Sequence, residues 1–386
     1  MLERPIFVVG SMRSGSTLFR LILDAHPRIS VSEETGFMGA LTATKTIPAW
    51  HHGAGWFRRL GWSDEEFDDR LREFFAGLFE RHALAQGKQR WGEKTPFHSR
   101  HIAEMATVFP DAVFVGIVRH PGAVVHSLMS KFHYGIDDAA AYWDSTNREI
   151  LRRGLELGDR RFALLRYEDL VQQPESTLRE LMDWLGESWS DDLLRHNDVQ
   201  AARGAPRISA GNTRTRDPIN PELADRWAEE LTAADLERLG ARTGAVAGFL
   251  GYDTDRPGAH RPLVPARGPE THLLLTGGRL ADRQSGPGAV GLDGADEPVI
   301  MPEMSAAELA KRLQQAEATL ARIRSRRAVR WGNAARRAQR RLAGLPVELL
   351  RSAVRPATRR RPAPAAGSPP AAPARGGRPA GPADLA

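Results

Sequence analysis

The hydrophobic pattern alternates between short apolar runs and stretches with helical spacing. Ile6–Val9 is apolar throughout and predicts a buried strand, and Ser16–Ala25 follows with Leu18, Leu21 and Ile22 on one side of a helix. The same alternation predicts strands over 112–118 and 161–165, and helices over 122–131, 176–184 and 221–239. Alternating strands and helices are typical of βαβ units, so the predicted fold class is α/β with a central parallel sheet.

The pattern weakens after Tyr252, which divides the chain into four parts. Residues 1–255 are expected to form one domain, and 256–300 are rich in Gly and Pro and predict a linker. Helical spacing returns in a basic segment over 301–355. Residues 356–386 consist mainly of Pro, Ala, Arg and Gly, a composition typical of disorder.

Composition and charge exclude several classes of protein. The chain of 386 residues has no cysteine, which excludes disulfides and thiolate metal sites. From residue 301 to the end there are 18 Lys and Arg against five Asp and Glu, a net charge of +13. Because the whole chain has a net charge of +6, the first 300 residues have a net charge of −7. This acidic body argues against nucleic acid as a partner. No signal-peptide pattern and no apolar run of about 18 residues is found, which predicts a cytoplasmic protein.

The basic character lies in the C-terminal segment. Arginine clusters between residues 322 and 361 interleave with Trp331 and several leucines. An amphipathic basic helix of this kind binds an anionic membrane surface or a protein partner. A solvated, partly helical appendage is the alternative.

A glycine- and serine-rich loop, GSMRSGST, joins the first predicted strand to the first predicted helix over residues 10–17. Such a turn presents backbone N–H groups and a helix N-terminus to an anion. It differs from the Walker A pattern because Ser16 stands at the lysine position, which argues against an ordinary ATPase or kinase. A turn without ligand is the alternative. The predicted anion contacts are Arg13, Ser14, Gly15, Ser16 and Thr17.

A second anion site is predicted around Arg119 and Ser127. Arg119 stands at the carboxyl end of the strand over 112–118, where open α/β sheets bind ligands. Ser127 lies about two turns into the following helix, with Lys131 one turn further. An arginine and a hydroxyl that converge there can hold a phosphate. Capping of the helix by these residues is the alternative.

These motifs resemble those of sulfotransferases that use 3′-phosphoadenosine 5′-phosphosulfate (PAPS). The segments RSGSTL (13–18), LDAHP (23–27) and EET (33–35) are similar to the opening of the tyrosylprotein-sulfotransferase type and its bacterial relatives. The resemblance runs from about residue 5 to residue 252. It implies a P-loop-type fold and transfer of a sulfonate from PAPS to an acceptor hydroxyl, with adenosine 3′,5′-bisphosphate as product. This chemistry does not require a metal, and no cluster of metal ligands stands out in the sequence.

The resemblance also implies roles for single residues. The loop over 13–17 holds the 5′-phosphosulfate, and Arg119 and Ser127 hold the 3′-phosphate. Glu34, the second Glu of the Glu-Glu-Thr motif, is the base that takes the hydroxyl proton. Lys94, in the polar segment WGEKTPF, and Arg13 stabilise the developing charge. Tyr167 contacts the nucleotide, and His98 is a reserve candidate for the base.

The sequence departs from the family in a late loop, where Asn220 stands in place of a basic residue. Arg214 or Arg216 is a candidate substitute. The lack of cysteine differs from the disulfide-bearing secretory enzymes, so a peptide tyrosine acceptor is not carried over. Carbohydrate, lipid, peptide and natural-product hydroxyls stay open, with the acceptor pocket expected in loops within 36–90 and 130–150. A P-loop kinase that uses ATP and a non-catalytic module tethered by its basic tail remain the alternatives.

Overall fold

The computed structural model describes residues 2, 4–46, 52–204, 210–254, 261, 263, 272–292 and 314. The predicted basic helical segment, its membrane or partner contact and the disordered tail lie outside the described residues, apart from Gln314. Among the described helices, none is long and apolar enough to cross a membrane.

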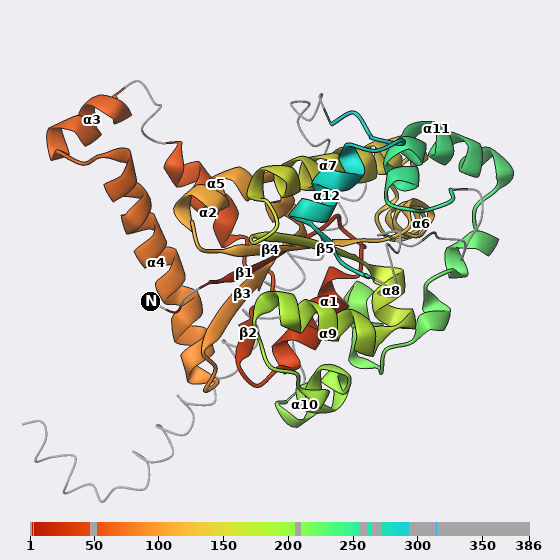
Figure 1. Cartoon of the computed structure of the whole chain (residues 1–386), viewed down its shortest axis with the longest axis horizontal. Helices are drawn as coiled ribbons and strands as arrows, with labels where there is room; N and C mark the ends of the chain where they lie inside the picture. Colours follow the sequence, from red (N-terminus) through yellow and green to blue (C-terminus); the bar gives the residue numbers. More distant parts are fainter. Residues whose placement is uncertain are drawn as a thin grey trace, which may run out of the picture. The chain divides into compact units, whose positions relative to one another are not determined.

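A six-stranded sheet in the order β2-β3-β1-β4-β5-β6 forms the centre of the described part of the chain (Figure 1). The first five strands are parallel, and β6 is antiparallel to β5. The strands are β1 (Ile6–Val9), β2 (Ile29–Val31), β3 (Arg90–Lys94), β4 (Val113–Val118), β5 (Phe162–Arg166) and β6 (Leu275–Thr276). The predicted α/β fold with a central, mostly parallel sheet is confirmed.

Helices cover both faces of the sheet, so its strands are buried on both sides. Phe7 and Val9 point into one core and Ile6 and Val8 into the other, as expected for alternating side chains along β1. The first core includes residues of α2 (Phe37–Lys45), α4 (Asp64–Ala85), α5 (Ile102–Val108), α6 (Pro121–Phe132), α7 (Ile136–Leu157), α11 (Ala233–Phe249) and α12 (Gly277–Gln284). The second includes residues of α1 (Ser16–Ala25), α8 (Tyr167–Gln172) and α9 (Pro174–Leu185).

Strand β3 corrects the prediction of a polar loop around Lys94. Its sequence, RWGEK, has only one large apolar residue. A search for apolar runs therefore does not recognise it as a central strand. The charged side chains are buried because each has partners. Arg90 Nη1 donates to the carbonyl oxygen of Leu185 (2.9 Å), and Glu93 accepts from the Thr95 hydroxyl (2.7 Å).

The loops predicted within 36–90 and 130–150 are largely helical. Helix α4 begins at a capping box in which the Ser63 hydroxyl accepts the Glu66 N–H at 3.1 Å. Further along α4, Leu71, Phe75 and Phe79 recur every four residues and are buried. A short helix, α3 (Gly53–Leu60), precedes it, and α7 occupies most of the second range.

The helix predicted over 221–239 begins later than expected. Thr232 caps α11 by accepting the Asp235 N–H (3.2 Å), and two short 3₁₀ turns, η5 (Pro221–Leu223) and η6 (Arg226–Glu229), precede it. A capping side chain at Thr232 sets the start of the regular helix, which the apolar spacing alone does not reveal.

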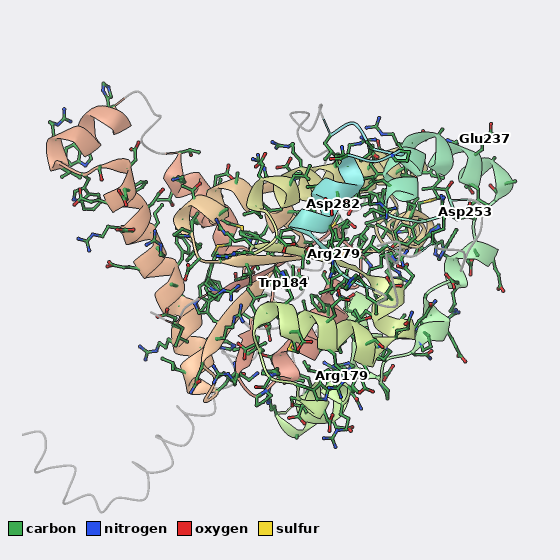
Figure 2. All side chains as sticks on the ribbon, viewed as in Figure 1. Arg179, Trp184, Glu237, Asp253, Arg279 and Asp282 are labelled. Carbon is green, nitrogen blue, oxygen red and sulfur yellow. The ribbon has the colours of Figure 1, made fainter. Side chains whose placement is uncertain are left out.

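The predicted linker over 256–300 needs correction for residues 272–292. There, β6 extends the sheet and α12 packs on α7 in the first core. Arg279 on α12, labelled in Figure 2, is held to the domain by a contact with α9. Its Nη1 donates to the Glu180 carboxylate (2.7 Å). The strand is only two residues long, so its hydrophobic signal is too short to recognise among glycines and prolines.

Candidate functional site

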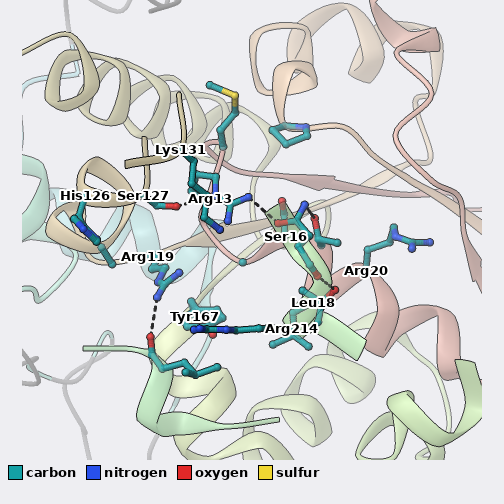
Figure 3. A pocket seen from close by; sticks show the side chains of 18 of the residues that line it. Arg13, Ser16, Leu18, Arg20, Arg119, His126, Ser127, Lys131, Tyr167 and Arg214 are labelled. Carbon is teal, nitrogen blue, oxygen red and sulfur yellow. Dashed lines mark hydrogen bonds between the residues drawn. The ribbon is translucent and has the colours of Figure 1, made fainter. Parts of the chain in front are cut away.

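Each of the five parallel strands delivers one candidate residue to the same edge of the sheet. Arg13 follows β1, Glu34 follows β2, Lys94 ends β3, Arg119 follows β4 and Tyr167 follows β5. All five line one cavity of about 700 Å³ (Figure 3). Ligands of open α/β sheets bind at this carboxyl edge. The predicted residues therefore come together although up to 154 positions separate them in the sequence.

The loop after β1 takes a path that only glycine permits at two positions. Gly15 has a φ of 93°, and a Cβ there would lie 2.2 Å from the Tyr167 ring. A Cβ on Gly10 would lie 2.6 Å from the carbonyl oxygen of Ile117. Glycine tolerates both the positive φ and the close approach. The N-terminus of α1, at Ser16, consequently faces the pocket, where its N–H groups can receive an anion.

Two buried side chains also hold the loop after β1 in place by accepting hydrogen bonds from its backbone. The Tyr142 hydroxyl accepts the Met12 N–H (2.8 Å), and the Ser99 hydroxyl accepts the Gly10 N–H (2.9 Å). Burial raises the pKa of Tyr142 to about 12, so its proton stays in place at neutral pH. The Ser14 side chain is buried against Gly10 and does not line the pocket, unlike the other predicted loop contacts.

Lys94 and Glu34 form an ion pair at one end of the pocket. Lys94 Nζ donates to Glu34 Oε1 and to the Thr17 hydroxyl at 3.3 Å. The lysine side chain is 1% exposed, whereas that of Glu34 is 47% exposed. Burial lowers the pKa of Lys94, and the Glu34 carboxylate opposes this shift. A desolvated cation thus lies beside the loop over residues 10–17, and it is paired with a carboxylate that molecules from solvent can reach.

The second predicted anion site lies at the other end of the pocket. Arg13 Nε donates to the Ser127 hydroxyl (2.9 Å), and the Arg119 guanidinium lies over the Tyr167 ring at 4.4 Å. Burial and the nearby charge of Arg119 lower the pKa of Arg13. Arg119 Nη2 donates to the carbonyl oxygen of Leu223 (3.2 Å), whereas its Nε is buried without a hydrogen-bond partner. Two arginines are therefore held close together, with donor capacity left for an anion.

The pocket carries an excess of positive charge, which suits a ligand with several negative charges. Its acidic lining residues are Glu33, Glu34 and Glu230. Its basic lining residues are Arg13, Arg20, Lys94, Arg119, Lys131, Arg214 and Arg226. Within the described part of the chain, no group of three or more His, Asp or Glu side chains is arranged to hold a metal.

The late loop supplies residues that the sequence did not single out. Asn212 Oδ1 accepts from Arg13 Nη1 (2.7 Å), and Asn212 Nδ2 donates to the Thr17 hydroxyl (3.4 Å). Arg214 lines the pocket, whereas Arg216 does not. Asn220 also lines it, but its side chain accepts the Glu222 N–H (2.9 Å) and caps η5. Arg214 and Arg216 were the two candidates to replace the family's basic residue in this loop, and only Arg214 lines the pocket.

The reserve base, His98, is buried away from the pocket lining. Its Nδ1 lies 2.6 Å from Glu93 Oε2, inside the cluster that stabilises β3. The position favours a structural role for this histidine.

Trp227 forms part of the pocket wall and packs on the start of α6. Its ring stacks on His120, with centroids 4.4 Å apart, and covers Gly122. Its indole N–H is buried and has no hydrogen-bond partner in the structure. Trp227 lies 107 residues after His120 in the sequence, so no local motif signals this contact.

Gly122→Ala should destabilise the protein by about 1–3 kcal/mol, because the new Cβ would meet the Trp227 ring at 2.3 Å. Gly244→Ala in α11 is the matched control, since a Cβ there has no neighbour within 4 Å. Within a helix, alanine is more stable than glycine by about 0.5–1 kcal/mol. Urea unfolding of both variants measures the difference. Equal stability of the two would contradict the described packing of Trp227.

Comparison with known proteins finds similarity to sulfotransferases. Residues 5–191 match a protein family described as the Sulfotransferase family. Protein-tyrosine sulfotransferase 2 of Gallus gallus is 29% identical over 293 residues, covering 71% of this chain and 77% of that protein. Protein-tyrosine sulfotransferase 1 of Danio rerio is 30% identical over 261 residues, covering 64% and 72%. The sulfotransferase domain of the Synechococcus PCC 7002 olefin synthase is 27% identical, covering 65% of this chain and 96% of that domain, with a TM-score of 0.46.

Proposed function

Because the chain belongs to the sulfotransferase family, we propose that it transfers the sulfonate group of PAPS to an acceptor hydroxyl, with Glu34 as the base. One observation carries the proposal. The Lys94–Glu34 pair contacts Thr17 of the phosphate loop, in a pocket whose other end holds Arg119 and Ser127. A base, a desolvated cation and two separate anion sites therefore share one cavity.

The residues present fit the two charged ends of PAPS. The loop over 13–17 and the N-terminus of α1 offer N–H groups for the 5′-phosphosulfate. Arg119 and Ser127 offer donors for the 3′-phosphate, and the buried, unpartnered Arg119 Nε supports this assignment. Burial and then the nearby charges of Arg13, Arg214 and Arg119 lower the pKa of Lys131. Lys131 therefore belongs to the same group of cations around the proposed 3′-phosphate site.

The chemistry assigned to the side chains follows from their positions. The acceptor oxygen would bond to sulfur while the bond from sulfur to the bridging oxygen of the 5′-phosphate breaks. Glu34 takes the hydroxyl proton, and adenosine 3′,5′-bisphosphate leaves. Lys94 provides positive charge beside Thr17, where negative charge develops on the leaving phosphate.

Calorimetric titration with adenosine 3′,5′-bisphosphate tests the donor site, with ATP as the comparison. We expect tight binding of the bisphosphate and weak binding of ATP, because ATP has no 3′-phosphate for Arg119. Arg119→Ala should weaken bisphosphate binding by about 10- to 100-fold, the contribution of hydrogen bonds to a charged group. Arg28→Ala is the control, since Arg28 is about half exposed, pairs with Glu187 and lies outside the pocket. A preference for ATP would favour the kinase alternative instead.

A further inference from the structure

A second cavity adjoins the pocket on the side of Glu34. We call this cavity of about 690 Å³ the side groove. Arg20 and Glu33 line both cavities, and Glu33 directly precedes the proposed base. Figure 3 shows Arg20 at the opposite side of the pocket from Arg119. The side groove therefore continues the pocket away from the proposed 3′-phosphate site, where an acceptor has to approach.

One wall of the side groove is apolar. It consists of Phe37 at the start of α2 and Leu78 and Phe79 on α4. Phe37 is 39% exposed and Leu78 is 40% exposed, although both are large apolar side chains. The ring of Phe37 packs on that of Phe79, with centroids 6.0 Å apart, which holds the wall in place. The wall thus offers fixed apolar surface to a ligand.

The remaining lining residues of the side groove are mostly polar, and several already contact one another. Asp24 accepts from Gln200 Nε2 (3.0 Å) and pairs with Arg203 (3.5 Å). Arg20 Nη1 donates to the carbonyl oxygen of Val31 (3.1 Å). Two arginines and two carboxylates line the groove, unlike the basic pocket beside it. The side groove therefore has no excess charge with which to select an anionic acceptor.

We propose that the side groove binds the uncharged, apolar body of the acceptor, an alkyl or aryl group, while the attached hydroxyl reaches Glu34. The inference rests on the proposed sulfonate transfer and adds the class of acceptor. Contact with the apolar wall removes apolar surface of both partners from water, which is the main source of affinity that this groove offers.

A series of 4-alkylphenols, from phenol to 4-hexylphenol, tests the acceptor class with PAPS and the full chain. We expect kcat/KM to rise about fourfold for each added methylene that reaches the wall. Leu78→Asp should remove this rise, so that the variant turns over 4-hexylphenol no faster than phenol, whereas the unmodified protein favours the longer chain. Phe74→Asp is the matched control, because Phe74 lies on the same helix and is 63% exposed but does not line the groove.

Binding of adenosine 3′,5′-bisphosphate, measured for each variant, separates this inference from the proposed function. Unchanged binding in Leu78→Asp shows that the donor pocket is folded. Turnover independent of chain length, or a Leu78→Asp variant that keeps the rise, would overturn the assignment of the groove while donor binding stands. Preference for glucose over every alkylphenol would also overturn it. Failure of the unmodified protein to bind the bisphosphate would overturn both proposals.

Discussion

Replacing Glu34 with glutamine is expected to lower kcat by about 10²- to 10⁴-fold, the range that a positioned general base contributes. The amide keeps the size of the side chain and can still accept a hydrogen bond from Lys94 Nζ, but it cannot take the hydroxyl proton. Since Glu34 lies at the end of the pocket away from Arg119, affinity for adenosine 3′,5′-bisphosphate should not change. Transfer of labelled sulfate from PAPS to 4-hexylphenol, with the bisphosphate titrated in parallel, measures both quantities.

Glu33→Gln provides the matched control for this substitution. Glu33 is exposed, neighbours Glu34 and lines the same pocket, but the ion pair with Lys94 is formed by Glu34. The Glu33→Gln substitution should therefore leave kcat within a small factor of that of the unmodified protein. Turnover that survives Glu34→Gln, or that falls equally in both variants, would reject Glu34 as the base.

Lys94→Met is expected to lower kcat by about 10²- to 10³-fold, the loss seen when one group that stabilises transition-state charge is removed. Methionine fills much of the volume of the lysine stem but leaves no cation beside Thr17 and no partner for Glu34. Because Lys94 is only 1% exposed, Lys94→Arg should not restore the rate: the planar guanidinium needs more room than the ammonium.

Lys45→Met is the control for general effects of losing a lysine. Lys45 is half-buried, pairs with the buried Asp68 between α2 and α4, and does not line the pocket. Single-turnover rates of the three variants, with bisphosphate affinity as a check of the folded pocket, provide the comparison. A Lys94→Met variant as active as Lys45→Met would show that the buried ammonium has no part in the reaction.

The two proposed anion-binding segments can be recognised in the sequence because the pattern of each is local. The loop over 10–17 needs a strand, two glycines and a helix in immediate succession, and Arg119 with Ser127 needs one strand and two turns of helix. Such short patterns can be identified in the sequence without knowledge of the fold. Glu34 and Lys94 were identified through the family resemblance, and the structure brings them into contact with each other.

The parts that the sequence did not reveal depend on contacts between distant segments. Asn212 and Trp227 enter the pocket from a region of short 3₁₀ turns that carries no regular hydrophobic pattern. The predicted site residue Lys94 lines the pocket, but it ends a strand and not a loop, because β3 is stabilised by buried polar partners rather than apolar side chains. The side groove likewise needs helices α2 and α4, in a range that was expected to contain loops.

The late strand β6 has a consequence for how the chain folds. Leu275 and Thr276 pair with Leu164 and Ala163, so the edge of β5 acquires its partner only after more than 100 further residues have been synthesised. Until then the hydrogen-bonding groups on that side of β5 are open to another chain, and such unprotected edges promote aggregation. A fragment that ends at Tyr252, where the hydrophobic pattern fades, would contain every residue assigned to the reaction. It would nevertheless lack β6, and the edge of β5 would stay unpaired and prone to aggregation.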